Sequence, residues 1–219
     1  MADLADFLPD VLPWCVGVSA PLAERAVLHA AREFCEYTGW WRSDELFTTV
    51  TDESATGEYA LTLATGTALV SVLNPIWHAS VPVYLKPAAW LTENYTKDWR
   101  TKTGEQADFF TMTAKATVRL VPYPTTAVAD DLRVTKILKP ALTSPTVDDT
   151  VLDDWSEAIG WGAVARLKAQ PGQAWSDQND AAAKLLLFEE AKQKAKSKAV
   201  ADWQDRNFQR NRRVAGHHF

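Results

Sequence analysis

Residues 19–41, SAPLAERAVLHAAREFCEYTGWW, are the stretch around which the rest of the chain must fold. Ser19 is a preferred helix cap, Pro21 suits a first helical turn and Gly39 suits a helix end, so both boundary signals are present. Small and apolar residues recur between them at spacings of three and four: Ala23, Val27, Ala30, Phe34 and Tyr37. The stretch therefore predicts an amphipathic helix whose apolar side must be covered by other parts of the chain.

Helical periodicity returns only near residue 150. An apolar stripe from Leu152 to Leu167 predicts a second long helix, which Pro171 ends. Gly160 and Gly162 lie inside it and cost helix stability, roughly 1 kcal/mol each. We therefore expect another backbone to approach closely there, with the alanine-rich first helix as the preferred partner.

A third helix is predicted from Ser176 or Asp177 to about Arg206, which is about 30 residues or about 45 Å. Its apolar stripe comprises Ala181, Leu185, Phe188, Ala195, Ala199 and Trp203. The first two helices are too short to cover this length. Its far end is expected to project toward another subunit, with a free, frayed end rich in lysine as the alternative.

The middle of the chain carries the signals of short strands. Runs rich in β-branched residues, separated by turn residues, occur at 46–51, 58–63, 68–73, 76–85, 116–121 and 132–138. Residues 92–113 predict a long loop or a hairpin. The expected fold class is therefore α+β, with an antiparallel helical bundle formed by the N- and C-terminal thirds, a central β-rich insertion and a long projecting C-terminal helix.

The same signals divide the chain into four parts. Pro9 and Pro13 predict an extended N-terminal arm over residues 1–18. The helical bundle domain is predicted at 19–43 and 148–205, the β-rich insertion at 44–147 and a basic C-terminal tail at 206–219.

Composition and charge restrict the class of protein. The chain has 219 residues, 47% of them hydrophobic, so one large domain or two small ones can bury a core. Two cysteines, a proline-broken acidic N-terminus and the lack of a long apolar run predict a soluble protein of a reducing compartment, with no membrane partner. The formal net charge is −5, and nine Lys and Arg face four Asp and Glu from Lys184 onward. An acidic body argues against a protein whose main task is to grip nucleic acid phosphates.

A search for catalytic chemistry finds no familiar motif. The four histidines match no metal-ligand or haem spacing, and the glycines match no phosphate-binding or serine hydrolase pattern. The acidic cluster Asp148, Asp149, Asp153 and Asp154 predicts helix capping more simply than a metal site. We predict no enzyme activity, no cofactor and no metal, and ten tryptophans instead favour permanent interfaces.

Several segments together resemble a known family. They are Asp10 to Pro13 (DVLP), Ala30 to Cys35 (AAREFC) with Thr38 and Trp40, Trp99 before a Thr-Gly step, Val118 to Pro124 (VRLVPYP), Trp155 to Leu167, and the Pro171-Gly172 and Trp175-Ser176-Asp177 steps before the last helix. In this order they resemble the head-to-tail adaptor, or tail tubular, proteins of tailed bacteriophages. The resemblance covers nearly the whole chain and depends on the succession of segments, because none of them is catalytic.

The resemblance implies a structural virion protein at the neck, assembled in the host cytoplasm. Such a protein forms a ring of twelve copies beneath the portal protein, joins a downstream tail or neck protein, and continues the channel through which genomic DNA passes without sequence-specific binding. The charge and position of the tail suggest that it docks on the portal. The hypothesised portal-binding residues are Arg206, Phe208, Arg210, Arg212, Arg213 and Phe219.

Three other functions remain open. The first is another neck or tail ring, such as a tail terminator or a tube-completion protein, although a terminator is expected to be mainly sheet with one flanking helix. The second is a nucleic-acid-binding protein that uses the basic tail, whose binding should fall steeply with salt. The third is an enzyme with an unfamiliar carboxylate site between Asp148 and Asp154.

Overall fold

The structure, a computed structural model, describes residues 1–49, 57–125 and 128–215, with side chains except those of 128–130 and 202–215. It separates into two compact units. Unit 1 comprises Met1–Trp41, Gly66–Ala68 and Leu138–Phe219, and unit 2 comprises Arg42–Thr65 and Leu69–Ile137. Each unit is described by itself.

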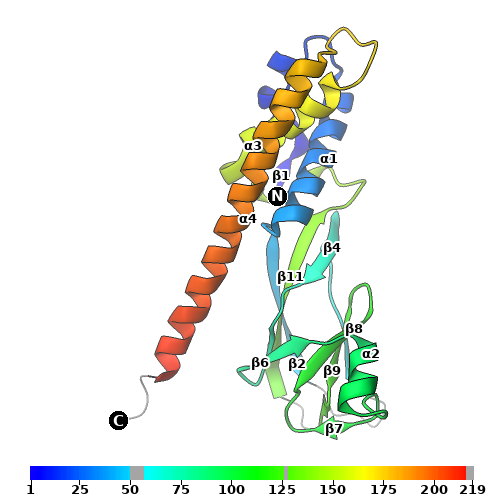
Figure 1. Cartoon of the computed structure of the whole chain (residues 1–219), viewed down its shortest axis with the longest axis vertical. Coiled ribbons are helices and arrows are strands. Elements are labelled where there is room, and N and C mark those ends of the chain that lie inside the picture. Colours follow the sequence, from blue (N-terminus) through cyan, green and yellow to red (C-terminus); the bar gives the residue numbers. More distant parts are fainter. Residues whose placement is uncertain (50–56, 126–127, 216–219) are drawn as a thin grey trace. The chain divides into compact units, whose positions relative to one another are not determined.

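The predicted fold class is wrong. The protein is mixed α/β with a large eight-stranded sheet, and not an antiparallel helical bundle with a central β-rich insertion (Figure 1). The strand order is β2-β11-β5-β6-β8-β9-β3, and β4 also pairs with β11. Local periodicity identifies single strands, but their joining into one sheet depends on pairings between distant segments, such as that of β2 with β11, which no local pattern contains.

The strands of this sheet pair mostly in antiparallel fashion. They are β2 (Arg42–Thr49), β3 (Glu58–Ala60), β4 (Thr67–Val72), β5 (Ile76–His78), β6 (Val81–Leu85), β8 (Phe109–Ala114), β9 (Thr117–Val121) and β11 (Val128–Pro140). The exception is the parallel pair of β6 and β8. A two-stranded sheet of β7 (Thr103–Gly104) and β10 (Tyr123–Pro124) accompanies them.

Residues predicted as a loop or hairpin at 92–113 contain more regular structure than expected. A short helix, α2 (Ala88–Trp90), continues into the π-helical segment η3 (Leu91–Tyr95), and strand β8 follows. The segment buries Leu91, Trp99 and Phe110 in unit 2. Burial of these large side chains stabilises the region. The polar residues between them led to the prediction of a loop.

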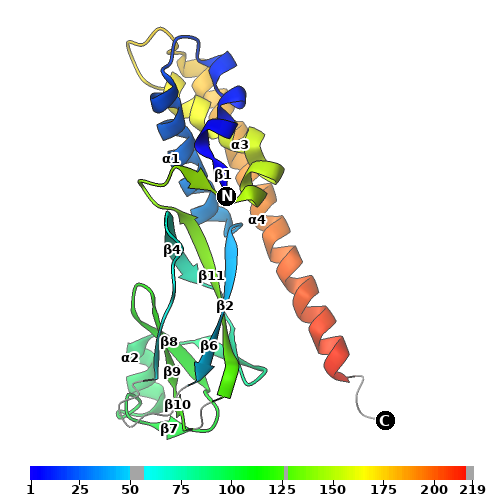
Figure 2. The same ribbon diagram turned by 180° about the vertical axis from the view of Figure 1, so that it is seen from behind.

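Unit 1 is built on three long helices, α1 (Ala20–Thr38), α3 (Asp149–Lys168) and α4 (Gln178–Ala215) (Figures 1 and 2). The predicted first helix is confirmed, with Pro21 in its first turn and Gly39 at its end at a φ of 61°. Its apolar stripe is buried as predicted, since Ala23, Val27, Ala30 and Phe34 are fully inaccessible to solvent.

The two glycines of α3 are close-packing positions, as predicted. A Cβ atom on Gly162 would lie 3.0 Å from the Cβ of Ala30 in α1 and 3.0 Å from the ring of Phe188 in α4. A Cβ atom on Gly160 would lie 2.8 Å from the Cβ of Asp10, so its neighbour is the N-terminal segment and not α1. Because Gly162 has no side chain, α1, α3 and α4 can pack closely together at this position.

Residues 1–18 do not form the predicted extended arm. Strand β1 (Ala2–Asp3) pairs with β12 (Thr146–Val147), and two 3-10 helices follow, η1 (Leu4–Asp10) and η2 (Leu12–Trp14). Phe7 and Val11 are fully buried within unit 1. Pro9 and Pro13 exclude a long α-helix, but they are compatible with short 3-10 turns that anchor apolar side chains.

Candidate functional site

Helix α4 is the longest element of unit 1 and the candidate for assembly contacts. It spans 38 residues, from Gln178 to Ala215, and so extends beyond the predicted end near Arg206. The carboxylate of Asp177 accepts hydrogen bonds from the backbone N–H groups of Asn179 (3.0 Å) and Asp180 (3.1 Å). This cap satisfies free N–H groups of the first turn and fixes where the helix begins.

The hypothesised portal-binding residues lie at the C-terminal end of this helix. The backbone of Arg206, Phe208, Arg210, Arg212 and Arg213 belongs to α4, whereas Phe219 lies outside the described residues. The side chains of the five helical residues are also outside the described part of the chain. Their clustering on one helical segment follows from the backbone alone.

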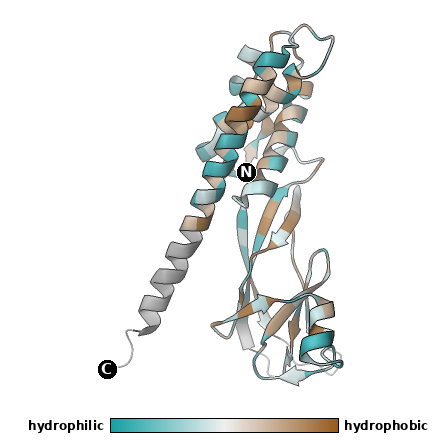
Figure 3. Cartoon of the chain, viewed as in Figure 1, coloured by the Kyte–Doolittle hydropathy of each residue, from teal (hydrophilic) through white to brown (hydrophobic). Residues whose placement is uncertain are grey.

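The buried side of α4 differs from the prediction in one respect. Ala181, Phe188, Ala195 and Ala199 are buried as predicted, Leu185 is 45% exposed, and the side chain of Trp203 lies outside the described residues. Leu186 and Leu187 are exposed as well, so the three form an exposed leucine turn, and Figure 3 shows a hydrophobic stretch on the upper half of α4. The buried side of α4 instead includes two lysines, Lys184 and Lys192, whose long aliphatic stems are buried. The ammonium group of Lys192 pairs with Glu33, and that of Lys184 lies 3.5 Å from the centre of the Trp14 ring.

Lys192 is the centre of an ion-pair network in unit 1. Its Nζ lies 2.5 Å from Glu33 Oε1 and 2.6 Å from Glu189 Oε1, and Glu33 also pairs with Arg166 of α3. Burial alone would lower the pKa of Lys192, but hydrogen bonds to Glu189 and Glu33 outweigh it and raise that pKa. Burial likewise opposes ionisation of Glu33, yet its bonds to Lys192 and Arg166 hold its pKa below the ordinary value. The network therefore keeps Lys192 and Glu33 charged and ties α1, α3 and α4 together.

A cleft of about 870 Å³ lies beside this network. We call its charged lining the basic groove, which comprises Arg25, His29, Arg32, Arg166 and Lys192. Among the described residues, neither Arg25 nor Arg32 has a carboxylate partner, and Arg32 donates to the backbone carbonyl of Pro140. Burial, followed by the charges of Arg166, Arg25 and Arg32, lowers the pKa of His29. The groove thus carries an excess of positive charge, although the chain as a whole is acidic.

A second cleft, of about 490 Å³, lies between α3 and α4. We call its charged lining the acidic hollow, which comprises Asp153, Asp154, Glu157 and Glu190. None of these four carboxylates forms an ion pair with another described residue, and Lys194 is the one cation in the lining. Trp161 and the 37% exposed Leu187 give the hollow an apolar floor.

The predicted acidic cluster is therefore divided between two roles. Asp148 caps α3, because its carboxylate accepts from the N–H of Thr150 at 3.1 Å, and Asp149 pairs with the amino group of Met1. Asp153 and Asp154 face the acidic hollow instead. Contacts at the start of α3 thus explain half of the cluster, Asp148 by capping and Asp149 by its ion pair with Met1.

Neither charged lining was predicted from the sequence, although the spacing of the charged residues indicated both. Arg25, His29 and Arg32 are spaced by four and three residues, as are the members of an apolar stripe, so they share one side of α1. The spacing of Asp154, Glu157 and Trp161 on α3 is of the same kind. Searching only for apolar stripes overlooks such charged ones.

Among the described residues, His78 and the two cysteines have structural roles. His78 is buried in unit 2, where its Nδ1 accepts from the N–H of Ala107 at 3.2 Å and its Nε2 faces Asp131 at 3.2 Å. Cys15 and Cys35 are buried and unpaired with each other, and burial raises the pKa of Cys35 to about 12. Within residues 1–49, 57–125 and 128–215, no group of three or more His, Cys, Asp or Glu side chains is arranged to hold a metal ion.

Comparisons with known proteins add no relative. No family model matches the chain, and neither does any curated protein. In the part of the chain that the structure describes, no helix combines the length and the apolar character required to span a membrane.

Proposed function

We propose that this protein is a structural component of a tailed-bacteriophage virion, an adaptor that forms a ring between the portal and the tail. The ring of about twelve copies continues the channel for genomic DNA. The proposal begins from the ordered series of segments, from Asp10 to the last helix, that resembles this family. The observation that carries it is the length of α4.

Helix α4 is long compared with the elements that pack against it in unit 1. Its 38 residues correspond to about 57 Å, whereas α1 has 19 residues and α3 has 20. The last side chain of α4 that is described as buried is Ala199. Two helices of about 30 Å do not cover a helix of this length, so α4 extends past them and offers surface for contact with another protein, which would also stabilise it.

The charges support the same role. Residues from Lys184 onward carry nine Lys and Arg against four Asp and Glu, while the rest of the chain is acidic. We propose that Arg206, Phe208, Arg210, Arg212, Arg213 and Phe219 contact the portal, since arginine pairs well with carboxylates at interfaces. An acidic remainder lets DNA pass along the ring without strong binding.

The test is the mass of the assembly formed with the portal ring encoded by the same phage. Mass photometry of the mixture, compared with each component alone, is expected to show about one added copy per portal subunit. An unchanged portal mass would contradict the adaptor role.

The docking residues require a separate variant. Replacing Arg206, Arg210, Arg212 and Arg213 by Gln is expected to weaken portal attachment by tenfold or more, an order-of-magnitude effect of losing several charged contacts. The matched control replaces Lys86, Lys97, Lys102 and Lys115 of unit 2 by Gln and should retain attachment. Equal attachment of both variants would remove the tail from the interface.

The nucleic-acid alternative predicts a different result. If the basic tail mainly bound DNA, affinity for duplex DNA would fall steeply between low and high salt and would vanish in the same arginine variant. The adaptor role predicts weak DNA binding that the variant leaves almost unchanged.

A further inference from the structure

Unit 1 carries two surfaces of opposite charge that the proposed function leaves without a role. The basic groove contains four cations besides His29, and the two carboxylates that line the same cleft, Glu33 and Glu36, are already bonded to lysine or arginine side chains. The acidic hollow contains four carboxylates and one lysine. Each surface therefore keeps unneutralised charge, and the two charges have opposite signs.

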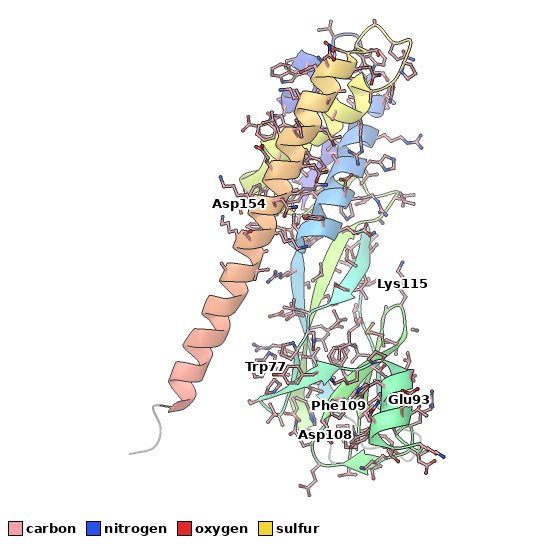
Figure 4. The ribbon with its side chains drawn as sticks, viewed as in Figure 1. Trp77, Glu93, Asp108, Phe109, Lys115 and Asp154 are labelled. Atoms are coloured by element: carbon pink, nitrogen blue, oxygen red, sulfur yellow. The ribbon has the colours of Figure 1, made fainter. Side chains whose placement is uncertain are left out.

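The two surfaces lie on different sides of unit 1. Lys192 is the residue of α4 in the basic groove, whereas Leu187, Glu190, Ala191 and Lys194 line the acidic hollow. At about 100° per residue, the centre of the second set lies about 150° around the helix from Lys192. Figure 4 shows Asp154 on the side of α4 that faces away from α1.

We propose that the basic groove of one copy binds the acidic hollow of the next copy, so that unit 1 forms the lateral contact of the ring. This inference rests on the ring of the proposed function, and it identifies the two surfaces that join neighbouring copies in that ring. The occupant of the groove is thus a second copy of this chain, whose exposed Asp154 and Glu157 reach Arg25 and Arg32.

Charge complementarity decides the geometry of the contact. A two-fold dimer would place groove against groove or hollow against hollow, and like charges facing each other are unfavourable. A head-to-tail contact pairs opposite charges at every interface, and repetition of one such contact produces a ring when the rotation closes. Half-buried apolar side chains, Leu22 and Tyr37 in the groove and Trp161 in the hollow, add contact area beneath the charges.

Two charge-reversal variants test the contact. The groove variant carries Arg25→Glu and His29→Glu, and the hollow variant carries Asp154→Lys and Glu157→Lys; all four positions are exposed, so both variants should fold. The controls place comparable changes on exposed positions of unit 2, Lys97→Glu with Lys115→Glu and Glu93→Lys with Glu105→Lys. Circular dichroism and thermal unfolding verify that each variant is folded.

Self-association is measured by sedimentation velocity at about 50 mM and about 500 mM salt, because charged contacts weaken as salt screens them. Each reversal variant alone is expected to associate at least about tenfold more weakly than the wild type, and the controls within about threefold of it. The same proteins are then added to the portal ring, where the number of bound copies is counted by mass photometry.

Mixing the two reversal variants gives the decisive result. In a head-to-tail ring they can alternate, since a reversed groove then meets a reversed hollow and a native groove meets a native hollow. The equimolar mixture should therefore recover association to within about threefold of the wild type, with equal numbers of both variants by native mass spectrometry. A two-fold contact predicts a different pattern: only one of the two variants would be altered when alone, and the mixture would stop at dimers, whereas the head-to-tail contact weakens both variants and the mixture forms larger assemblies.

The outcomes separate this inference from the proposed function. Full portal occupancy by both reversal variants, or no recovery on mixing, overturns the head-to-tail contact and leaves the adaptor role intact. Recovery on mixing without portal attachment supports the contact and overturns the adaptor role. A wild-type chain that associates neither alone nor on the portal overturns both.

Discussion

The cores of the two units are held together in partly different ways. In unit 1, cations at the helix contacts are matched by carboxylates, as Lys192 and Arg166 are by Glu33. In unit 2, Arg100 is 4.2 Å and Arg119 is 5.6 Å from the ring of Trp99, and ion pairs also occur, as between Lys136 and Glu45. The comparison teaches that both units use ion pairs, but unit 1 adds close helix packing at Gly162, whereas unit 2 adds an aromatic cluster around Trp99.

The largest expected effect follows from removing the central aromatic side chain of unit 2. Trp99→Ala should destabilise unit 2 by about 3–5 kcal/mol, because it empties the volume of a side chain that is only 2% exposed. Chemical denaturation followed by hydrogen exchange measures the loss unit by unit. Tyr84→Ala, at a position 49% exposed, is the control and should cost less than about 1 kcal/mol. Equal losses for the two variants would show that the aromatic cluster does not hold unit 2 together.

The next effect concerns the close packing of unit 1. Gly162→Val should destabilise this unit by about 1–3 kcal/mol, because the new side chain meets Ala30 and Phe188 where even a Cβ lies at 3.0 Å. Thermal unfolding measures the change. The matched control Ala182→Val, on the exposed side of α4, changes only helix propensity by a few tenths of a kcal/mol. If Gly162→Val were tolerated as well as the control, the three helices would not be in close contact.

A smaller effect tests the ion pairs. Glu33→Gln should cost about 1–2 kcal/mol, since it leaves the buried ammonium of Lys192 with only the exposed Glu189 as carboxylate. Lys192→Met should cost less than about 1 kcal/mol, because Glu33 keeps Arg166 and the apolar stem is preserved. A double-mutant cycle between the two positions isolates their coupling. Zero coupling would mean that the network contributes nothing to unit 1.

The smallest expected effect separates the units by pH. Burial, only partly opposed by Asp131, lowers the pKa of His78 below 6.5, so the unfolded chain binds a proton that folded unit 2 rejects. Stability of unit 2 should therefore be complete above pH 6.5 and decline as the pH falls below it. In unit 1 the lowered pKa of His29 acts in the same direction, but His29 is exposed, so its contribution should be smaller; the lowered pKa of Glu33 acts only below its ordinary value of 4.5.

Hydrogen exchange between pH 4.5 and 6.5 checks this difference. Protection should fall more in unit 2 than in unit 1, and His29→Gln should remove most of the fall in unit 1. His78→Gln lowers overall stability but should flatten the pH dependence of unit 2 in this interval. A parallel decline of both units in the wild type would contradict the assignment to His78.

The three long helices, α1, α3 and α4, were predictable because their signals are local, whereas the short helical segments at 4–14 and 88–95 were not. The stripe from Ala23 to Phe34 and the glycines at 160 and 162 correctly indicated buried surfaces and close approach. The sheet was not predictable, because β2 pairs with β11 across more than 80 residues and β6 pairs in parallel with β8. Neither pairing leaves a mark in a short window of sequence.

The charged surfaces were only partly predictable. Arg25, His29 and Arg32 show helical spacing, but the sequence alone does not reveal that Lys192, far along the chain, joins them in one cleft. The buried lysines also mislead a hydropathy reading of α4, since Leu185 is exposed where Lys184 is buried. A lysine stem fills a core position as well as a leucine when its charge finds a partner.

Contacts of lysine side chains fix the position of α4 along its own axis. Lys184 lies over the ring of Trp14, Lys192 bonds Glu33, and Asp180 pairs with Lys168. A slip of α4 by one helical turn would move each of these partners by about 5.4 Å and break all three contacts. These side-chain contacts therefore set the position of α4 along its axis, and the C-terminal end of the helix lies a fixed number of residues beyond them.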